Sequence, residues 1–297
     1  MSEVLYLGID GGGSKCRARI RDSAGRLLGE GAGGPANIYR DRSEAIASLL
    51  AAAQQATLSA DLGEDNLGHL QAGLGLAGIT TEKMARELEE QETWPFASVT
   101  IDNDAYAACL GAHEGHDGGV VITGTGSAAL AVVGGHRHAL GGWGFQIGDD
   151  GSGARIGQLA VRRAVLAADK LAPSSPLYDQ ILAGFGGKLA DITAWARHAQ
   201  PGDYAQYAPQ VIAAATGGDV EASAILRAAG ESLGDLLLGL KRFAAPRLSL
   251  IGGLSSAILP WLPEASRRLI ELPLGDPVDG AILMARRRHL RGEVSSW

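Results

Sequence analysis

The first third of the chain alternates short apolar runs with longer amphipathic segments. Two strand-like runs occupy residues 4–22 and are joined by a cluster of glycines. Between residues 43 and 60, apolar side chains return every three or four positions, which is the spacing of one helix face. Asp41 followed by Glu44 is typical of a capping box at the start of such a helix. The pattern therefore predicts a strand hairpin and then a helix.

The same alternation extends through the rest of this half. Further apolar runs predict strands at 26–30, 71–77 and 97–101, and amphipathic runs predict helices at 81–91 and from 102 to 110. A loop rich in glycine and proline fills residues 31–40. Strands therefore precede helices in this part of the chain.

Residues 113–119 are polar and rich in glycine, and the pattern begins again after them with a second hairpin at 120–133. The following segments predict helices at 154–170, 176–183, 188–199, 205–215 and 220–243, a strand at 247–251, and helices from 255 and at 278–291. Because strands again precede helices, we expect an α/β protein of two domains, residues 1–115 and 116–297. The last helix is a candidate to pack back on the first domain.

The composition is typical of a globular enzyme. The chain has 297 residues, 46% of them hydrophobic, and a formal net charge of -7. This acidic balance argues against a nucleic acid partner, which requires a basic stripe. Two distant cysteines, Cys16 and Cys109, exclude a disulfide framework and a zinc ribbon. No apolar run approaches the ~20 residues that span a bilayer. With no signal peptide pattern either, we expect a cytoplasmic protein without a membrane partner.

One unusual passage occurs twice. In each copy an apolar strand runs into glycines and hydroxyl residues, ending at Ser14 and at Ser127, and a second strand follows. Gly13 and Gly126 take matching places, as do the two serines. Glycines at such turns let backbone N–H groups converge on an anion. The repeat predicts two phosphate-binding turns that hold a polyphosphate between two similar domains.

Asp10 closes the first strand directly before the glycines. A carboxylate in this place can hold Mg²⁺ through water while the turn accepts phosphate. The alternative is a tight hairpin whose aspartate bonds its own backbone. The passage is not a Walker A loop, because Ser14-Lys15 inverts the usual Lys-Ser order and a strand follows.

Residues 124–129 also fit Gly-x-Gly-x-x-Ala, the fingerprint of dinucleotide-binding folds. In those folds the motif opens a helix whose N-terminus meets the pyrophosphate. Here a run of strand formers follows as far as Val133, which is too short for the usual crossover helix. A dinucleotide oxidoreductase therefore requires a helix directly after Gly126, whereas a phosphate turn requires a strand.

The sequence Asp102-Asn103-Asp104 follows a predicted strand and opens a predicted helix. We expect one of the two aspartates to cap that helix. A carboxylate at the end of a strand can also orient a sugar hydroxyl and accept its proton. Asp104 is our candidate for this general base.

A loop at residues 141–153 combines clustered glycines with Trp143, Asp149 and Asp150. Carboxylates bind sugar hydroxyls well, and glycines let the backbone approach a sugar ring. The alternative is a long turn in which Ser152 or Asp150 caps the next helix.

Two further places are ambiguous. Asn37 lies in a loop where it fits either a turn residue or a ligand contact. Gly252-Gly253 joins a strand to a helix, which suits an adenine or phosphate site as well as a plain junction.

Taken together, these passages resemble the sugar kinase/actin/heat-shock ATPase superfamily. The likeness is to its N-acetylglucosamine and glucosamine kinase branch, which also includes the ATPase activators of benzoyl-CoA reductase type. Residues 9–15 resemble the first phosphate motif, 122–127 the second, and 252–253 the adenosine motif. Residues 142–152 resemble the sugar-kinase loop and are the most specific of the set.

The resemblance implies two ribonuclease-H-like domains with an interdomain cleft, ATP and Mg²⁺ as cofactors, and a homodimer. It also implies roles position by position. The nucleotide would contact Gly12, Gly13, Ser14, Lys15, Thr125, Gly126, Ala215, Gly252 and Gly253, with Asp10 organising magnesium. The amino sugar would contact Asn37, Asp104, Gly142, Trp143 and Asp149, with Asp104 as the base.

The resemblance thus predicts ATP-dependent phosphorylation of glucosamine or N-acetylglucosamine at the 6-hydroxyl. The alternative is a nucleotide-gated regulatory ATPase without a sugar substrate. The reductase activators share a cluster held by cysteines, and neither Cys16 nor Cys109 lies in a suitable loop. The 2-substituent stays open, because an ammonium would favour Asp149 or Asp150 nearby and an acetamide would favour an apolar niche.

Overall fold

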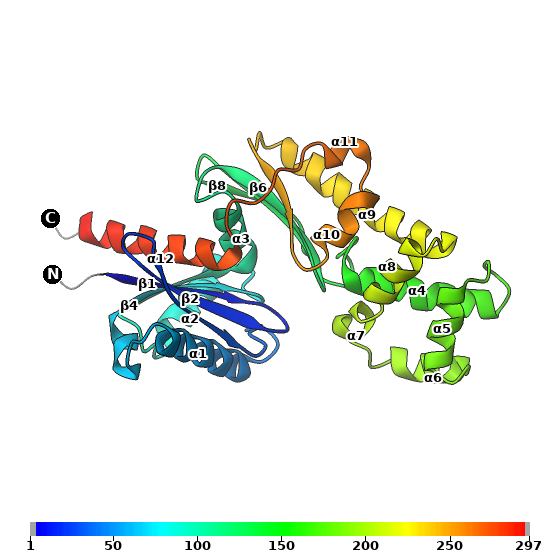
Figure 1. Ribbon diagram of the computed structural model, residues 1–297, viewed down its shortest axis with the longest axis horizontal. Helices are drawn as coiled ribbons and strands as arrows, with labels where there is room; N and C mark the ends of the chain where they lie inside the picture. The colour runs from blue at the N-terminus through cyan, green and yellow to red at the C-terminus, as the bar shows by residue number, and fades with distance from the viewer. Residues whose placement is uncertain (1–3, 295–297) are drawn as a thin grey trace. The chain divides into compact units, whose positions relative to one another are not determined.

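The computed structural model describes residues 4–294, of which 64–65 and 291–294 are placed by their backbone alone. The chain divides into two compact units (Figure 1). Unit 1 consists of two segments, one that ends at Asp117 and one that begins at Pro273. Unit 2 is Gly118–Leu272. We expected the second domain to continue to residue 297, with its last helix a candidate to pack back on the first domain, and the segment after Leu272 does lie with unit 1.

A five-stranded sheet forms the centre of unit 1, in the order β3-β2-β1-β4-β5. Its strands are β1 (Leu5–Gly11), β2 (Cys16–Asp22), β3 (Leu27–Gly33), β4 (Leu70–Leu76) and β5 (Ser98–Asn103). β2 is antiparallel to both of its neighbours, while β1, β4 and β5 run parallel. The carboxyl ends of β1, β4 and β5 therefore share one edge of the sheet.

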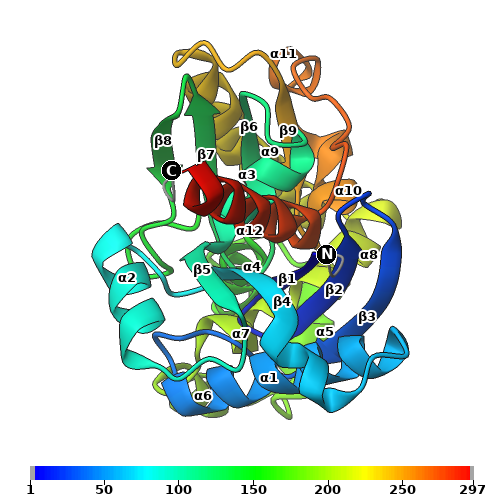
Figure 2. The ribbon, with the colours of Figure 1, turned by 90° about the vertical axis from the view of Figure 1, so that its left-hand side faces the viewer.

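Helices cover both faces of this sheet (Figure 2). On one face α1 (Arg42–Ser59) and α2 (Glu82–Gln91) share an apolar core with Leu7 and Ile9 of β1. On the other face lie α3 (Asp104–Ala112) and α12 (Pro277–Val294). A short 3-10 helix, η1 (Glu64–His69), precedes β4.

The close approach of α12 depends on glycine in the sheet. A Cβ on Gly73 would lie 1.9 Å from the carbonyl oxygen of Ala281, so any other residue would push the helix away. α12 thus belongs to unit 1 although about 200 residues separate it from β4, a distance that sequence periodicity does not bridge.

Unit 2 repeats the same sheet order in four strands, β8-β7-β6-β9. They are β6 (Gly118–Thr123), β7 (Ser127–Val133), β8 (His136–Gly141) and β9 (Leu248–Ile251). A parallel bridge from Leu248 to Ile270 occupies the place of the fifth strand. Both units therefore have the ribonuclease-H-like arrangement that was predicted.

Unit 2 is otherwise helical. Its helices are α4 (Gly153–Ala168), α5 (Pro176–Gly184), α6 (Leu189–Ala196), α7 (Pro201–Ala205), α8 (Ala208–Thr216), α9 (Val220–Lys241), α10 (Ser255–Ile258), η2 (Leu259–Trp261) and α11 (Glu264–Arg267). The helix predicted at 205–215 begins only at Ala208, because Pro209 lacks the N–H that would continue α7. Leucines of α9 and the apolar face of the sheet share one core.

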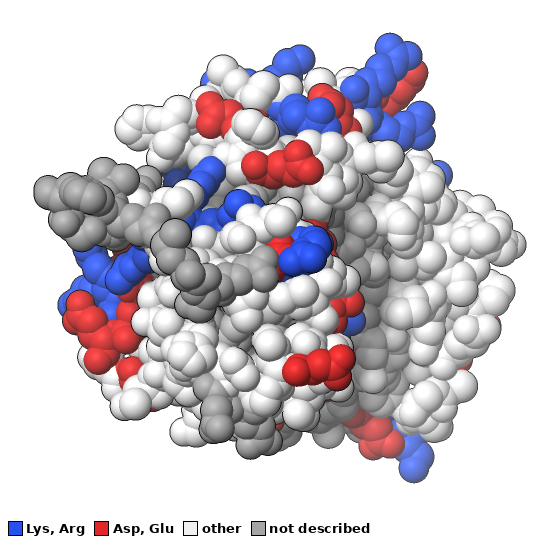
Figure 3. All heavy atoms as spheres, turned by 60° about the vertical axis from the view of Figure 1, so that its left-hand side comes forward, with Lys and Arg blue, Asp and Glu red and all other residues white. Residues whose placement is uncertain are grey.

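Surface features agree with the composition. Positive and negative side chains are interspersed on the face drawn in Figure 3, rather than gathered in a basic stripe. Cys16 and Cys109 are buried thiols. Within residues 4–294, no helix is both long and apolar enough to cross a membrane.

Candidate active site

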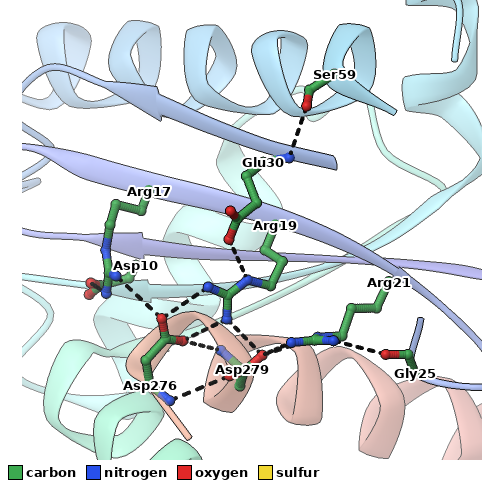
Figure 4. A network of polar contacts seen from close by, with 9 residues as sticks. All are labelled: Asp10, Arg17, Arg19, Arg21, Gly25, Glu30, Ser59, Asp276 and Asp279. Atoms are coloured by element: carbon green, nitrogen blue, oxygen red, sulfur yellow. Dashed lines mark hydrogen bonds and ion pairs between the residues drawn. The ribbon is translucent and has the colours of Figure 1, made fainter. Parts of the chain in front are cut away.

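Asp10 stands in β1, one residue before the strand ends. Its carboxylate accepts a hydrogen bond from Arg17 Nη2 at 3.1 Å, and Arg17 is the residue opposite it on β2 (Figure 4). Burial raises the pKa of Asp10, and the charge of Arg17 opposes this effect. The Asp10 side chain keeps 22% of its surface exposed. It is therefore accessible to a ligand.

These properties fit magnesium. Mg²⁺ is usually bound through one or two carboxylates, with water and substrate phosphates completing its octahedron. Asp10 provides one such carboxylate beside a glycine turn. Within the part of the chain that the structure describes, no three metal-ligating side chains gather in one place. A single carboxylate leaves most of the magnesium ligands to water and substrate phosphates.

Arg17 belongs to a network of ion pairs between β2 and the start of α12 (Figure 4). Asp276 lies 3.3 Å from Arg17 and 3.0 Å from Arg19. Asp279 lies 2.8 Å from Arg19 and 3.1 Å from Arg21. Asp276 also caps α12, because its Oδ1 accepts the Asp279 N–H at 3.0 Å. The network therefore orients the guanidinium that contacts the β1 carboxylate.

The sequence interpretation missed this network. Its signal was present in β2, where Arg17, Arg19 and Arg21 alternate and must share one face of the sheet. The acidic partners could not be found in the same way, since they follow about 255 residues later in the chain.

Asp104 is the first residue of α3, directly after β5. Asn103 caps this helix, with its Oδ1 accepting the Tyr106 N–H at 2.7 Å. The expectation that Asp102 or Asp104 would be the cap is therefore wrong. The Asp104 carboxylate is thus not the cap, although its Oδ1 accepts the N–H of the next residue, Ala105, at 2.9 Å.

The sheet brings Asp104 close to Asp10. Gly75 of β4 pairs with Asp10 on one side and Asp102 on the other. A Cβ on Gly75 would lie 2.4 Å from the Ala107 side chain, so glycine is what lets α3 pack here. Burial, together with the nearby Asp10 charge, raises the pKa of Asp104 to about 6. Such a carboxylate is ionised at neutral pH and is a better base than an ordinary aspartate.

The first glycine turn comprises residues 12–15. It is closed by a hydrogen bond from the Gly12 N–H to the Lys15 carbonyl at 3.0 Å. Gly13, Ser14 and Lys15 are exposed, and the space beside Gly13 is open. A phosphate can therefore approach both the turn backbone and the Ser14 hydroxyl.

The second turn comprises residues 124–126, closed by a hydrogen bond from the Gly124 N–H to the Gly126 carbonyl at 2.9 Å. A strand, β7, begins directly after it at Ser127. A dinucleotide site would require a helix at this point, so that alternative is wrong. A strand at this point is what the phosphate-turn interpretation requires.

The two hairpins do not align as their sequences suggest. In the strand ladders, Ser127 opens β7 as Cys16 opens β2. The expected match between Ser14 and Ser127 is therefore wrong, because the second turn is shorter by one residue. Ser127 is buried and donates to the Asp150 carbonyl at 2.8 Å. Thr125 provides the exposed hydroxyl of the second turn.

Asn37 lies in unit 1, in the loop between β3 and α1. Its Oδ1 accepts the N–H groups of Tyr39 at 3.0 Å and Arg40 at 3.1 Å. The side chain thus organises its own turn. A contact to a sugar hydroxyl would use the Nδ2 group of the same amide.

The loop between β8 and α4 carries the candidate sugar contacts of unit 2. Gly142 has a φ of +72°, and Trp143 is 73% exposed. Asp149 adopts a φ of 60°, a left-handed conformation that aspartate tolerates better than most residues. A Cβ on Gly126 would lie 2.9 Å from Asp149 Oδ2, so this carboxylate lies beside the second turn. Burial raises the pKa of Asp149.

The end of the loop shows how it enters α4. Ser152 caps the helix, with its Oγ accepting the Arg155 N–H at 3.2 Å, which confirms one of the two expected caps. Asp150 instead forms an ion pair with Arg155, at 3.3 Å from Nε. Arg155 was not among the predicted site residues.

Of the candidate adenosine residues, Gly253 has open space beside it and Ala215 is buried. The Leu254 N–H donates to the Thr123 carbonyl at 3.1 Å, which holds the Gly252-Gly253 turn against the end of β6. The space beside Gly253 is open. Ala215 lies near the end of α8, and its side chain is buried in the core of unit 2.

Comparison with known proteins places these features in a family. A model of the BadF/BadG/BcrA/BcrD ATPase family matches residues 7–285. A glucosamine kinase from Vibrio cholerae is 38% identical over 94% of this chain and 95% of its own length. An N-acetyl-D-glucosamine kinase from Dictyostelium discoideum is 28% identical over 96% and 98%. A crystal structure from Chromobacterium violaceum, named "Putative N-acetylglucosamine Kinase", has a TM-score of 0.89 at 34% identity and covers 96% of this chain and 100% of its own.

Proposed function

The chain belongs to the BadF/BadG/BcrA/BcrD ATPase family, and from that membership we propose that it is an ATP-dependent kinase of an amino sugar. The acceptor in this proposal is the 6-hydroxyl of glucosamine or N-acetylglucosamine. The observation that carries it is the position of Asp104, a partly buried carboxylate at the start of α3 with a pKa of about 6, close to Asp10. The relatives from Vibrio cholerae and Dictyostelium discoideum support the choice of substrate class.

In this proposal Asp104 performs the proton transfer. Its carboxylate orients the sugar hydroxyl, whose oxygen attacks the γ-phosphorus of ATP. The hydroxyl proton passes to Asp104, and ADP leaves with the electron pair of the broken P–O bond. Mg²⁺, held through Asp10, would supply positive charge to the phosphates.

The two glycine turns bind the triphosphate in this account. The backbone N–H groups of these turns, other than those of Gly12 and Gly124, which close the turns, would face developing negative charge without reorganisation during the reaction. Ser14 and Thr125 add exposed hydroxyl donors. Ala215, Gly252 and Gly253 would line the adenosine.

The sugar is held by residues from both units in this proposal. Asn37 and Asp104 would bind hydroxyls from unit 1, and Gly142, Trp143 and Asp149 would bind the ring from unit 2. The exposed indole of Trp143 offers an apolar surface, while Asp149 offers a carboxylate. Both an acetamide and an ammonium at the 2-position therefore have a suitable group on the same loop.

The choice between kinase and regulatory ATPase is settled by the product. Purified protein with Mg-ATP and either amino sugar should yield a hexosamine phosphate, with the phosphorus coupled to the C6 protons in a ¹H–³¹P NMR spectrum. A 6-deoxy amino sugar is the control and should give no product. Hydrolysis of ATP with no sugar phosphate would support the regulatory ATPase instead.

We also propose that the enzyme acts in the cytoplasm as a homodimer. This rests on the resemblance to the kinase branch described above and on the composition of the chain. Light scattering coupled to size-exclusion chromatography tests the dimer, since a mass of 30.6 kDa would identify a monomer.

A further inference from the structure

One arginine connects to the sugar-loop backbone at several points. Arg155, in the first turn of α4, donates from Nη2 to the Phe145 carbonyl at 2.9 Å and to the Gly148 carbonyl at 2.7 Å. Its Nη1 donates to Gln158 Oε1 at 2.6 Å. Its Nε pairs with Asp150 at 3.3 Å, and the guanidinium lies 5.2 Å from the centre of the Phe145 ring. One side chain therefore holds three residues of the loop.

The loop requires such a tether. Gly142, Gly144 and Gly151 have positive φ angles, and Asp149 shares that conformation, so the backbone has much freedom to lose on ordering. The C-terminal part of the loop is fixed separately, since Thr123 Oγ1 donates to the Gly151 carbonyl at 3.1 Å. The stretch directly before Asp149 is held to the body of unit 2 through Arg155 and through the buried Phe145 side chain, which packs against Tyr204.

The loop also has space into which it could move. A cavity of about 380 Å³ lies behind it, lined by Phe145, Arg155 and Gln158 and by Gln200 and Tyr204. The guanidinium forms part of the wall of this cavity. Without it, the Phe145 and Gly148 carbonyls would lose their donor, and on that side the loop would be held by the Phe145 ring, which packs 5.3 Å from the Tyr204 ring between centroids.

We propose that Arg155 is a positioning residue for sugar binding, which clamps residues 145–150 so that Asp149 faces the amino sugar. This inference rests on the proposed function, because it assigns a role to the loop that would hold the substrate. Arg155 acts through the loop backbone rather than by touching the reacting atoms. Its effect is therefore expected on sugar affinity and not on the phosphoryl transfer step.

The primary test is the kinetics of Arg155→Met. Charge-assisted hydrogen bonds of this kind contribute about 1.5–3 kcal/mol, so KM for the amino sugar should rise by roughly 10- to 100-fold. KM for ATP should stay within about twofold, and kcat within about threefold, because Asp104 and the turns are untouched. An unchanged KM for the sugar would overturn the inference.

Arg163→Met is the matched control. Arg163 lies two turns further along α4 and pairs with Glu221 at 3.0 Å, away from the loop. The same substitution there should leave KM for the sugar within about twofold of the wild type. If both variants raise it equally, the effect is a general loss of stability in α4 and the clamp is rejected.

Arg155→Lys separates geometry from charge. An ammonium keeps the positive charge near Asp149 but cannot reproduce the planar fork that reaches two carbonyls. The clamp predicts that KM for the sugar stays raised, within about threefold of the methionine variant. Recovery of the wild-type KM would show that charge alone suffices and would contradict the clamp.

Hydrogen exchange tests the clamp without any activity measurement. In Arg155→Met without ligands, amides of residues 144–149 should exchange at least about tenfold faster, while those of β7 keep their wild-type rates. Unchanged exchange in the loop would overturn the inference. A wild-type protein that phosphorylates no amino sugar would instead overturn the proposed function, so the two failures are distinguishable.

Discussion

The β1–β2 hairpin of unit 1 and the β6–β7 hairpin of unit 2 share a strand order but carry different chemistry. At the end of β1, Asp10 faces Arg17 across the ladder. The corresponding pair in unit 2 is Ile122 with Ala128, both apolar. The polar group beside the second turn comes instead from a distant loop, through Asp149. The two hairpins therefore have the same backbone shape but different groups to offer: the first provides charge, and the second provides only uncharged backbone and hydroxyl donors.

The proposed general base, Asp104, belongs to unit 1, and Asp104→Asn tests its role. The amide keeps an acceptor for the Ala105 N–H, which Asp104 Oδ1 binds at 2.9 Å, so the fold and ATP binding should persist. Turnover with the amino sugar should fall by ~10²–10⁴-fold, as expected for the loss of a general base. Steady-state kinetics measure this, and a variant with wild-type turnover would remove Asp104 from the mechanism.

Asp10→Asn tests whether charge at the first hairpin serves magnesium. We expect the Mg²⁺ concentration for half-maximal activity to rise by roughly 10- to 100-fold, because the neutral amide is a weaker partner for the ion. Ile122→Val at the matching place in unit 2 is the control and should not change the Mg²⁺ requirement. An equal effect of both substitutions would contradict the asymmetry between the hairpins.

The ion pairs between β2 and the start of α12 are expected to stabilise the first hairpin. Asp276→Ala removes the cap of α12 and the partner of Arg17 and Arg19, so the free energy of unfolding should fall by about 1–2 kcal/mol. Asp41→Ala is the comparison, because it removes the cap of α1, where Oδ1 accepts the Glu44 N–H at 2.9 Å, without breaking an arginine pair in the described network. It should cost no more than about 1 kcal/mol in urea denaturation. A larger loss for Asp41→Ala than for Asp276→Ala would show that the network adds little.

The smallest expected effect is the change of kcat/KM with pH. Because burial and the charge of Asp10 raise the pKa of Asp104 to about 6, the base is ionised at pH 8 and mostly protonated at pH 5. The value of kcat/KM should therefore rise with pH and level off above 7, with about a tenfold difference between pH 5 and pH 8. A rate profile that stays flat down to pH 5 would argue against this base.

Local sequence patterns predicted much of the fold. The apolar runs identified the strands of the first sheet and, in the second, β6, β7 and β9. The strand formers after Gly126 in particular correctly predicted β7. The sequence predicted some of the helix N-caps correctly and others not. Ser152 was expected as a cap and is one, whereas Asn103 was overlooked between two aspartates that were equally good candidates.

The features that the sequence did not predict depend on contacts between residues that are far apart in the chain. The place of α12 against β4 is set by Gly73 and by the pairing of Asp276 with β2, and no periodicity of the helix itself reveals which sheet it covers. The correspondence between the two turns failed for a similar reason, since pairing in the ladder and not sequence spacing decides that Ser127 belongs to a strand. Arg155 was missed because its acceptors are backbone carbonyls, which every residue possesses.

The central claim is that this member of an ATPase family couples nucleotide cleavage to an amino sugar. The most direct measurement is the ratio of ADP to hexosamine phosphate formed in one reaction, with and without sugar. The account predicts one sugar phosphate for each ADP and almost no ADP when the sugar is omitted. ADP formation at the same rate whether or not glucosamine or N-acetylglucosamine is present would contradict it.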